Sequence, residues 1–348
     1  MSDALTRAWL LAIPCLLAGC HAGSGSYAGR YAGISTDAPE QPVTIVPLAG
    51  DITDRSAELS GLAWYGDQLI LLPQYPARFA DRNEGSVFAI PKERILAFLD
   101  GAADAPIEPS RIDFDDQGLA KRIRGFEGFE AIAFDGDRVY LTVEARRFTT
   151  MVGYLVAGRI EPHGKVLRLE PDSAVELSSQ SHVENMSDEV VLLTPDGVIT
   201  LHEANGARVN AHPVGYVFDP SLRPSKVVPF PNVEYRITDA TGLDEQRRFW
   251  AIDFFYPGDS WKLKPGPDAI AARHGVGPTH ARSRVVERLL EFQVTAQGIA
   301  LTDAPPIQLR LDPAGPRNWE GIVRLDDRGF LLATDKYPGT LLAFVPCP

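Results

Sequence analysis

A short hairpin pattern recurs along this chain and constrains its fold more than any other feature. The clearest copy spans residues 318–335, where an acidic entry, an apolar run, an Asp-Asp-Arg-Gly turn, a second apolar run and an acidic exit follow one another. Apolar runs joined by such a turn predict a β-hairpin. Aligned copies start at five positions: Ser60, Glu130, Ser187, Thr241 and Glu320. Successive copies are separated by about fifty to eighty residues, which fits propeller blades with inserted loops.

The repeats predict an all-β fold, a β-propeller of five blades, with a sixth degenerate blade as the main alternative. No alternation of strands with long amphipathic helices competes with this interpretation. The last copy has room for only three strands before the C-terminus, and residues 43–48 are a short β run near the other end of the chain. We therefore expect this N-terminal strand to complete the C-terminal blade and close the ring, which leaves no open sheet edge there.

Two smaller features refine this prediction. Residues 92–99 have apolar side chains at helical spacing and predict a short helix. The widest interval between copies contains residues 257–284, a polar stretch with several prolines and histidines that we interpret as an inserted loop.

The first nineteen residues predict a signal peptide rather than part of the fold. Arg7 precedes an apolar run that is too short to span a bilayer comfortably and ends in Leu-Ala-Gly-Cys. This pattern is typical of a bacterial lipoprotein, in which Cys20 is acylated, with palmitate for example; the alternative is an ordinary cleaved signal followed by an unrelated cysteine. We expect a signal peptide at 1–19, a flexible tether at 20–41 and a propeller domain at 42–348, with the protein anchored to the outer membrane and facing the periplasm.

Charge and cysteine content limit the partners. The formal net charge is -12, so nucleic acid and anionic membrane surfaces are unfavourable partners, whereas cations are favourable ones. Beyond Cys15 and Cys20, the mature chain has the single Cys347, so no disulfide framework is available and the core must stabilise the fold.

Several segments resemble a known family. The strand starts at 60–63, 129–133, 187–189 and 319–322, the late strand at 284–292 and the closing segment at 335–344 are similar, in this order, to the phytase-like domain, also called esterase-like activity of phytase. This family contains secreted bacterial β-propellers. The resemblance implies a propeller fold and hydrolysis of phosphoesters or related esters.

The ends of the hairpins carry the candidate functional residues. In an antiparallel hairpin, the start of the first strand lies beside the end of the second, so ring closure would gather these ends at one mouth of the central channel. Carboxylate oxygens suit Ca²⁺, and we expect the metal-proximal residues to be Glu130, Asp188, Asp253, Glu320 and Asp335. Lys336 and Arg317 border the last hairpin and are candidates for binding an anionic substrate. Alternatively, the carboxylates form turns and accept backbone hydrogen bonds.

The sequence therefore favours a lipid-anchored envelope protein that hydrolyses phosphoesters or related esters with the help of a divalent metal, which we expect to be Ca²⁺. The alternatives are a non-catalytic propeller that binds an envelope ligand or protein, and a purely structural envelope protein. A serine-hydrolase mechanism is disfavoured, because residues 258–261 do not match the Gly-x-Ser-x-Gly elbow. The sequence assigns no catalytic residue.

Overall fold

The strands expected from the repeats form in the computed structural model, which describes residues 31–80, 85–161 and 164–348. They assemble into units of four or five strands, and the strands of each unit are ordered from the molecular centre outwards. The first unit contains β3 (Leu59–Tyr65), β4 (Gln68–Pro73), β5 (Ser86–Pro91) and β6 (Ser110–Asp115). The second contains β7 (Phe126–Asp135), β8 (Arg138–Arg147) and β9 (Thr150–Ile160), and both β10 (Val166–Leu169) and β11 (Val175–Leu177) pair with β9.

The remaining units follow the same plan. The third contains β12 (Asp188–Thr194), β13 (Gly197–His202), β14 (Val214–Phe218) and β15 (Pro224–Pro229). The fourth contains β16 (Arg236–Ala240), β17 (Arg248–Phe255), β18 (Val286–Thr295), β19 (Gly298–Leu301) and β20 (Ile307–Leu309). The fifth contains β21 (Trp319–Leu325), β22 (Gly329–Thr334), β23 (Leu342–Pro346) and β2 (Thr44–Val46).

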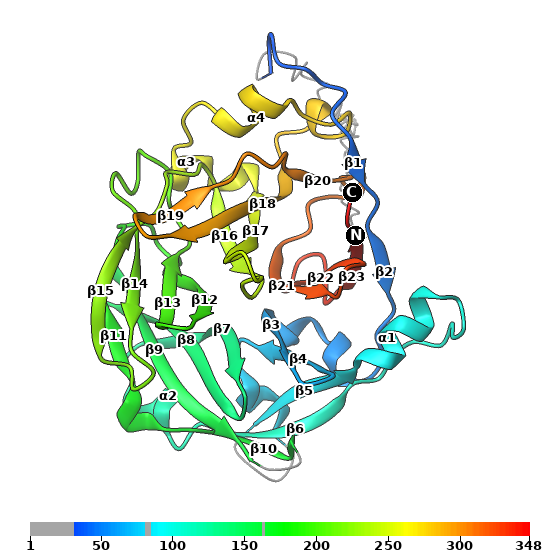
Figure 1. The fold of residues 1–348 in the computed structure, drawn as a ribbon. Coiled ribbons are helices and arrows are strands. Elements are labelled where there is room, and N and C mark those ends of the chain that lie inside the picture. The colour runs from blue at the N-terminus through cyan, green and yellow to red at the C-terminus, as the bar shows by residue number, and fades with distance from the viewer. Residues whose placement is uncertain (1–30, 81–84, 162–163) are drawn as a thin grey trace, which may run out of the picture.

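The innermost strands close a ring. β3 contacts β7, β7 contacts β12, β12 contacts β16, β16 contacts β21, and β21 contacts β3 again. Figure 1 looks along the axis of this ring, with the inner strands around the centre. Within the described residues the protein is thus a five-bladed β-propeller, as expected, and these residues contain no sixth blade.

The apolar runs of the inner strands are explained by packing on both faces. Along β4, Ile70 and Leu72 belong to a core shared with the second blade, whereas Leu69 and Leu71 belong to a core shared with the fifth. Successive side chains of a strand point to opposite faces, so each blade contributes to two hydrophobic layers. Similar layers lie between the second and third, third and fourth, and fourth and fifth blades.

The ring is closed by the two ends of the chain. β2 runs antiparallel to β23, with Ile45 opposite Ala343. In Figure 1 this blue strand lies beside the red C-terminal strand. The expectation that residues 43–48 complete the last blade is confirmed.

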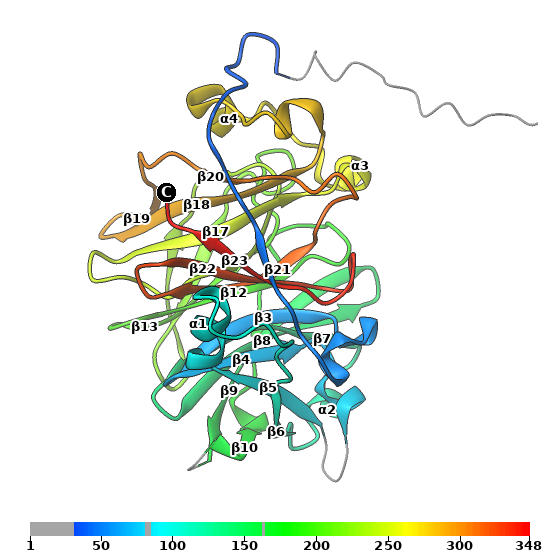
Figure 2. The same ribbon diagram turned by 90° about the vertical axis from the view of Figure 1, so that its right-hand side faces the viewer.

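The connecting segments position two further features. The predicted helix at 92–99 is α1 (Lys92–Leu99), on the connection from β5 to β6. The inserted loop between β17 and β18 contains α3 (Ser260–Leu263) and α4 (Ala269–His274), together with the short 3₁₀ helices Pro257–Asp259 and His280–Arg282. In Figures 1 and 2 α4 lies at the periphery of the ring, beyond β18 and β20 of the fourth blade.

The end of the expected tether is held against the propeller. β1 (Glu40–Gln41) pairs in parallel with β20. The Glu40 carboxylate accepts hydrogen bonds from the Thr279 hydroxyl at 2.7 Å and the backbone N–H of Thr279 at 2.9 Å. The N-terminal segment therefore crosses the outside of the molecule (Figure 2). The expected signal peptide and Cys20 lie outside the described residues, and in the described part no helix is long and apolar enough to cross a membrane.

Candidate functional site

Each inner hairpin contains a β-bulge at the same position. The strand register shifts between Leu59 and Gly61, Phe129 and Ile132, Asp188 and Val190, Ile237 and Ala240, and Trp319 and Gly321. A bulge inserts an extra residue and redirects its side chain. The residues passed over are Ser60, Glu130 with Ala131, Glu189, Thr238 with Asp239, and Glu320. The repeated bulge therefore places polar residues around the channel.

Four of these residues, Ser60, Glu130, Glu189 and Glu320, meet at one mouth of the central channel in a polar pocket of about 120 Å³, which we call the acidic mouth. Its carboxyl-bearing residues are Glu130, Glu144, Glu189, Asp259, Glu320 and Asp335. Its other polar residues are Ser60, Gln74, Asn185, Arg236, Lys262 and Asn318. The starts of first strands and the ends of second strands thus contribute to the same opening, as antiparallel pairing requires.

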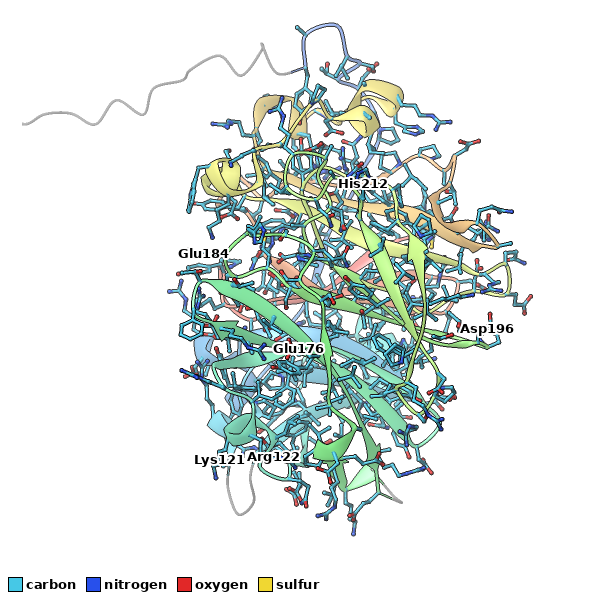
Figure 3. The ribbon with its side chains drawn as sticks, turned by 90° about the vertical axis from the view of Figure 1, so that its left-hand side faces the viewer. Lys121, Arg122, Glu176, Glu184, Asp196 and His212 are labelled. Atoms are coloured by element: carbon cyan, nitrogen blue, oxygen red, sulfur yellow. The ribbon has the colours of Figure 1, made fainter. Side chains whose placement is uncertain are left out.

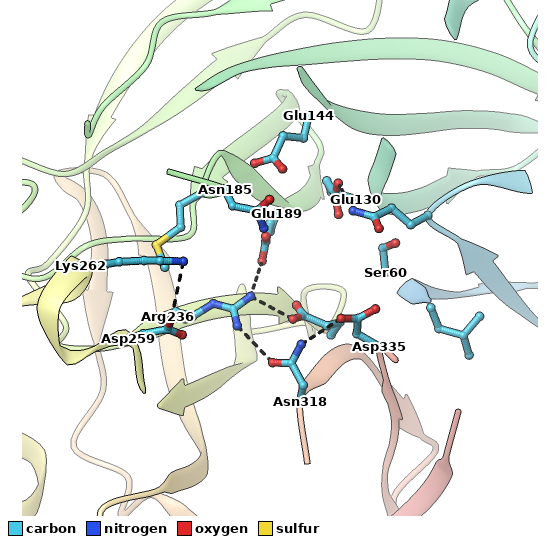
Figure 4. A pocket seen from close by; sticks show the side chains of 14 residues that line it. Ser60, Glu130, Glu144, Asn185, Glu189, Arg236, Asp259, Lys262, Asn318 and Asp335 are labelled. Atoms are coloured by element: carbon cyan, nitrogen blue, oxygen red, sulfur yellow. Dashed lines mark hydrogen bonds and ion pairs between the residues drawn. The ribbon is translucent and has the colours of Figure 1, made fainter. Parts of the chain in front are cut away.

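Arg236 occupies the middle of the acidic mouth. Its Nη2 lies 2.9 Å from Glu320 Oε1 and 3.9 Å from Glu189 Oε2, and its Nη1 donates a hydrogen bond of 3.1 Å to Asn318 Oδ1 (Figure 4). Its Nε donates to Glu203 Oε1. Although burial disfavours the charged form, the carboxylates of Glu320 and Glu189 raise the pKa of Arg236 above its ordinary value. The guanidinium is therefore a fixed positive charge.

The acidic mouth contains more carboxyl groups than the single Arg236 guanidinium can neutralise, and these carboxyl groups resist ionisation. Burial, with the charge of Glu144 and Glu189 adding to it, raises the pKa of Glu130 well above its ordinary value. Burial raises the pKa of both Glu144 and Glu320 to about 7. Burial and the Glu320 carboxylate raise the pKa of Glu189. Near neutral pH the acidic mouth consequently holds protons unless a cation replaces them.

Two carboxylate oxygens in the acidic mouth make no hydrogen bond to any described residue: Glu144 Oε1 and Glu189 Oε2. Both side chains are buried, with exposed fractions of 2% and 7% for their residues. By contrast, Glu130 accepts a hydrogen bond of 3.0 Å from Gln74, and Asp335 accepts one of 3.2 Å from Asn318. A buried oxygen without a hydrogen bond destabilises the folded protein. A ligand that binds these two atoms would therefore gain the most binding free energy.

Asp239 lies deeper in the channel and has a structural role. Its carboxylate accepts a hydrogen bond of 2.8 Å from the backbone N–H of Ile322 in the fifth blade and another from Leu62 in the first. A Cβ atom added to Gly321 would meet Leu62, and one added to Gly61 would meet the backbone of Glu130 and Ala131, so these glycines let the inner strands of neighbouring blades approach closely. Asp239 therefore ties the inner strands of three blades together beneath the acidic mouth.

Beyond this layer the channel becomes apolar. A cavity of about 420 Å³ at the opposite mouth is lined by side chains from all five inner strands or the residues that follow them, including Leu62, Ile132, Val191, Leu243 and Val323. The polar chemistry is thus confined to one end of the propeller. Figure 3 marks the two ends, with Glu184 near the end that carries α3 and Asp196 near the other.

Three of the five carboxylates expected near a metal, Glu130, Glu320 and Asp335, line the acidic mouth. Asp188 does not line it: it precedes the bulge, is buried, and accepts a hydrogen bond of 3.0 Å from Thr200. Asp253 also lies elsewhere, paired with Arg288 at 2.7 Å. Neighbouring strand residues point to opposite faces, so an alignment that is wrong by one residue selects the wrong side chain. The bulge places Glu189 rather than Asp188 in the mouth.

The two cations expected to bind substrate are engaged with other carboxylates and do not line the acidic mouth. Arg317 is buried and donates a hydrogen bond of 2.9 Å from Nε to Glu287. Lys336 forms an ion pair of 3.2 Å with Glu58. Lys262 from α3 and Arg236 from β16 are the cationic residues that line the mouth.

The repeats did not point to Arg236, because the fourth repeat was aligned with the others at Thr241. In the structure, the fourth-blade residue that matches Glu130 and Glu189 is Thr238. In the correct register Arg236 lies two residues before the bulge, at the channel mouth. Glu144 occupies the position in β8 that is equivalent to Asp335; the hairpin pattern places it at the same rim, although it was not among the residues expected near the metal.

A metal site is not preformed here. Among residues 31–80, 85–161 and 164–348, no three His, Cys, Asp or Glu side chains are arranged to hold a metal ion. The carboxylates are nevertheless of the type that Ca²⁺ prefers. The expectation of Ca²⁺ therefore stays a prediction that depends on movement of side chains.

Comparisons with known proteins add a likeness of fold. No protein-family model matches the chain, and no curated protein matches it. Among solved structures, it is similar to a luciferin-regenerating enzyme, with 10% identity, a TM-score of 0.45, and coverage of 88% of this chain and 95% of that one. It is also similar to the α-L-arabinanase of Cellvibrio cellulosa, with 11% identity, a TM-score of 0.45, and coverage of 82% and 89%. Both neighbours are enzymes, but at these scores the likeness carries no argument about function.

Proposed function

We propose that the acidic mouth is the active site of a hydrolase that cleaves phosphoesters or related esters. The observation that carries this proposal is a pair of buried oxygens that accept no hydrogen bond from a described residue, Glu144 Oε1 and Glu189 Oε2, in the same pocket as the Arg236 guanidinium. The pocket thereby combines proton acceptors with a fixed positive charge. Hydrolysis of an ester needs both, because water must lose a proton while negative charge develops on the substrate.

The residues have distinct roles in this proposal. Glu144 accepts the proton of the attacking water, since its pKa of about 7 matches neutral pH. Arg236 stabilises the developing oxyanion, because its planar guanidinium matches phosphate or carboxylate oxygens. Glu320 and Asn318 hold the guanidinium in place through Nη2 and Nη1. Gln74 and Asn318 orient the neighbouring carboxyl groups of Glu130 and Asp335.

A divalent cation fits the chemistry of this pocket. Glu130, Glu144 and Glu189 would hold it, after rotation of their side chains, with Glu320 and Asp335 nearby. The two oxygens without a hydrogen bond, Glu144 Oε1 and Glu189 Oε2, support this assignment. When bound, the cation supplies positive charge that polarises the ester and lowers the pKa of water. Asp188 and Asp253 do not line the pocket: Asp188 accepts a hydrogen bond from Thr200, and Asp253 pairs with Arg288.

The test uses purified protein with p-nitrophenyl phosphate and p-nitrophenyl acetate, each with Ca²⁺ or with EDTA. We expect release of p-nitrophenol from at least one ester, and a loss of about 10²-fold or more in Glu144→Gln, as expected for a general base. Asp196→Asn is the matched control, because this exposed carboxylate lies at the other end of the propeller. If neither ester is cleaved under either condition, or Glu144→Gln is as active as the control, the proposal is wrong.

A second candidate is a propeller that binds an envelope ligand or protein without catalysis. It is favoured by the absence, in the described part of the chain, of a ready group of metal ligands. It predicts a partner retained in pull-downs from envelope extracts by the native protein but not by Glu189→Gln, together with no turnover of either ester.

The proposal includes a lipid anchor at Cys20 on the periplasmic side of the outer membrane. The support is the Leu-Ala-Gly-Cys sequence after an apolar run. Cys20→Ser should move the protein from the membrane to the soluble fraction of cell lysates. Retention of this variant in the membrane would contradict the anchor.

A further inference from the structure

Large aromatic side chains are exposed on the loops around the acidic mouth. Trp261 in α3 is 67% exposed, and Tyr337 on the loop between β22 and β23 is 51% exposed. Trp261 lies between Asp259 and Lys262 in the chain, and both of these line the acidic mouth. Tyr337 follows Asp335, which also lines it. Two neighbouring blades thus each present an aromatic ring beside the same opening.

Contacts connect these rings to the acidic mouth. Lys262 Nζ lies 5.7 Å from the centre of the Trp261 ring and 3.7 Å from Asp259 Oδ1 (Figure 4 shows the second contact). The backbone carbonyl of Tyr337 accepts a hydrogen bond of 3.0 Å from the N–H of Asn318, which lines the mouth. The Arg55 guanidinium lies 4.6 Å from the centre of the Tyr337 ring. The Trp261 ring therefore lies beside a residue of the mouth, whereas Tyr337 is connected to the mouth through its backbone and its ring lies against Arg55.

Because the acidic mouth is small, a substrate must extend from it onto the surrounding loops that carry Trp261 and Tyr337. A volume of about 120 Å³ is below the range of about 300–1,000 Å³ that is usual for small-molecule sites. The mouth admits an ester group, whereas the rest of the molecule must lie outside, beside the exposed rings. An exposed Trp or Tyr offers a flat apolar face with a polar edge, so the remainder of the substrate should have an apolar ring face and polar edges.

The polar residues that line the acidic mouth further limit the class of substrate that it can bind. Carboxylates accept hydrogen bonds, and the amides of Asn185, Asn318 and Gln74 both donate and accept them. Hydroxyl groups satisfy both kinds of partner. A nucleic acid is disfavoured, because its phosphates would be repelled by a protein of net charge -12. A purely alkyl chain would leave the amides and carboxylates without partners.

We propose that the acidic mouth binds a carbohydrate that carries the ester, with one sugar ring stacked on Trp261 and an adjoining unit against Tyr337. Hydroxyl groups of the sugar bind the Asn185 and Asn318 amides and the mouth carboxylates. The assignment of an ester rests on the proposed function, whereas the binding of a carbohydrate does not.

The experiment measures binding rather than turnover. Detergent-solubilised full-length protein is applied to an array of bacterial and plant glycans, and the affinity for a retained oligosaccharide is then measured by calorimetry. We expect Trp261→Ala to weaken binding by about tenfold, the loss of one stacking contact, and Tyr337→Ala to weaken it less. Trp261→Phe should recover part of the affinity, because it keeps an aromatic face.

Val227→Ala is the control. Val227 is 55% exposed on β15, the outermost strand of the third blade, and does not line the acidic mouth. Since the side chains of Trp261, Tyr337 and Val227 are all exposed, these substitutions should leave the fold intact, which circular dichroism checks. The proposal is overturned if no glycan is retained, or if Val227→Ala weakens binding as much as Trp261→Ala. Glycan binding without ester cleavage would overturn only the proposed function, whereas cleavage of model esters without glycan binding would overturn only this inference.

Discussion

Arg236 and Glu320 come from the inner strands of adjacent blades and meet at 2.9 Å across the channel mouth. The Arg236 side chain is 11% exposed, and so is that of Glu320. This ion pair holds two blades together. Because further carboxyl groups surround it, it also determines the charge of the candidate site.

Removal of the guanidinium should therefore destabilise the fold. Arg236→Met leaves the buried carboxylates of Glu320 and Glu203 without their cation. Breaking one side of a buried ion pair costs about 3–5 kcal/mol, and we expect a loss of this size in chemical denaturation. The double variant Arg236→Met with Glu320→Gln should regain part of the loss, because it removes one of the uncompensated charges. A double variant no more stable than the single one would show that Glu320 is not the main partner.

Stability should fall as the pH rises towards neutral. Burial raises the pKa of Glu144 and Glu320 from 4.5 to about 7 in the folded protein. Below pH 4.5 both states hold these protons. Between 4.5 and 7 the unfolded chain loses them while the folded protein keeps them, so the folded state binds more protons and its relative stability declines. One such group contributes a loss on the order of 3 kcal/mol, complete above pH 7.

Urea denaturation from pH 5 to pH 8 measures this effect. Glu144→Gln, which cannot ionise, should flatten the profile relative to the native protein. Ca²⁺ at pH 8 should raise the denaturation midpoint if it replaces the protons, since a ligand of the native state stabilises that state. A midpoint that rises from pH 5 to pH 8 would contradict the assigned direction of these pKa shifts.

The deeper carboxylate should matter for stability more than for chemistry. Asp239→Ala leaves the buried N–H groups of Ile322 and Leu62 without an acceptor, which should cost about 2–4 kcal/mol. Asp239→Asn keeps an acceptor oxygen and should cost less. Both variants should retain glycan and metal binding at a temperature where they are folded. Thermal unfolding alongside the exposed control Asp196→Ala provides the measurement.

Ring closure can be tested within one strand. Val46 is fully buried in β2, whereas Thr44 in the same strand is exposed. Val46→Asp buries an unpaired charge and should separate β2 from β23, with rapid hydrogen exchange at Leu342–Pro346. Thr44→Asp should leave exchange there nearly unchanged. Equal protection of β23 in both variants would show that β2 does not hold the last blade.

The fold could be predicted from the sequence because its signals are local. Apolar runs around Gly-containing turns identify the hairpins, and the shortage of one strand in the last repeat identifies the closing strand at residues 43–48. The site was predicted in part. Glu130, Glu320 and Asp335 were found because they flank strong hairpins, but a bulge changes which side chain faces the channel without a clear mark in the sequence. The sequence therefore predicted Asp188 instead of Glu189 as a residue of the site, and it did not identify Arg236.

The partners of isolated charges could not be predicted either. Arg317 and Lys336 pair with Glu287 and Glu58, residues far from them in the chain or in another blade. Such pairs depend on the packing of blades and leave no periodic pattern. Lys262 and Trp261 lie in an inserted loop without a repeat, so only the structure places them beside the acidic mouth.

The pairing of β2 with β23 also determines the order of events during biosynthesis. Thr44–Val46 leaves the ribosome early, whereas its partner Leu342–Pro346 is among the last segments to be made. Until then the early strand has no sheet to join, and the first four blades can assemble only as an open arc. Contacts between such distant segments form slowly, and the incomplete arc exposes surfaces that aggregate. Folding of this protein should therefore depend on chaperones that shield the arc until synthesis ends.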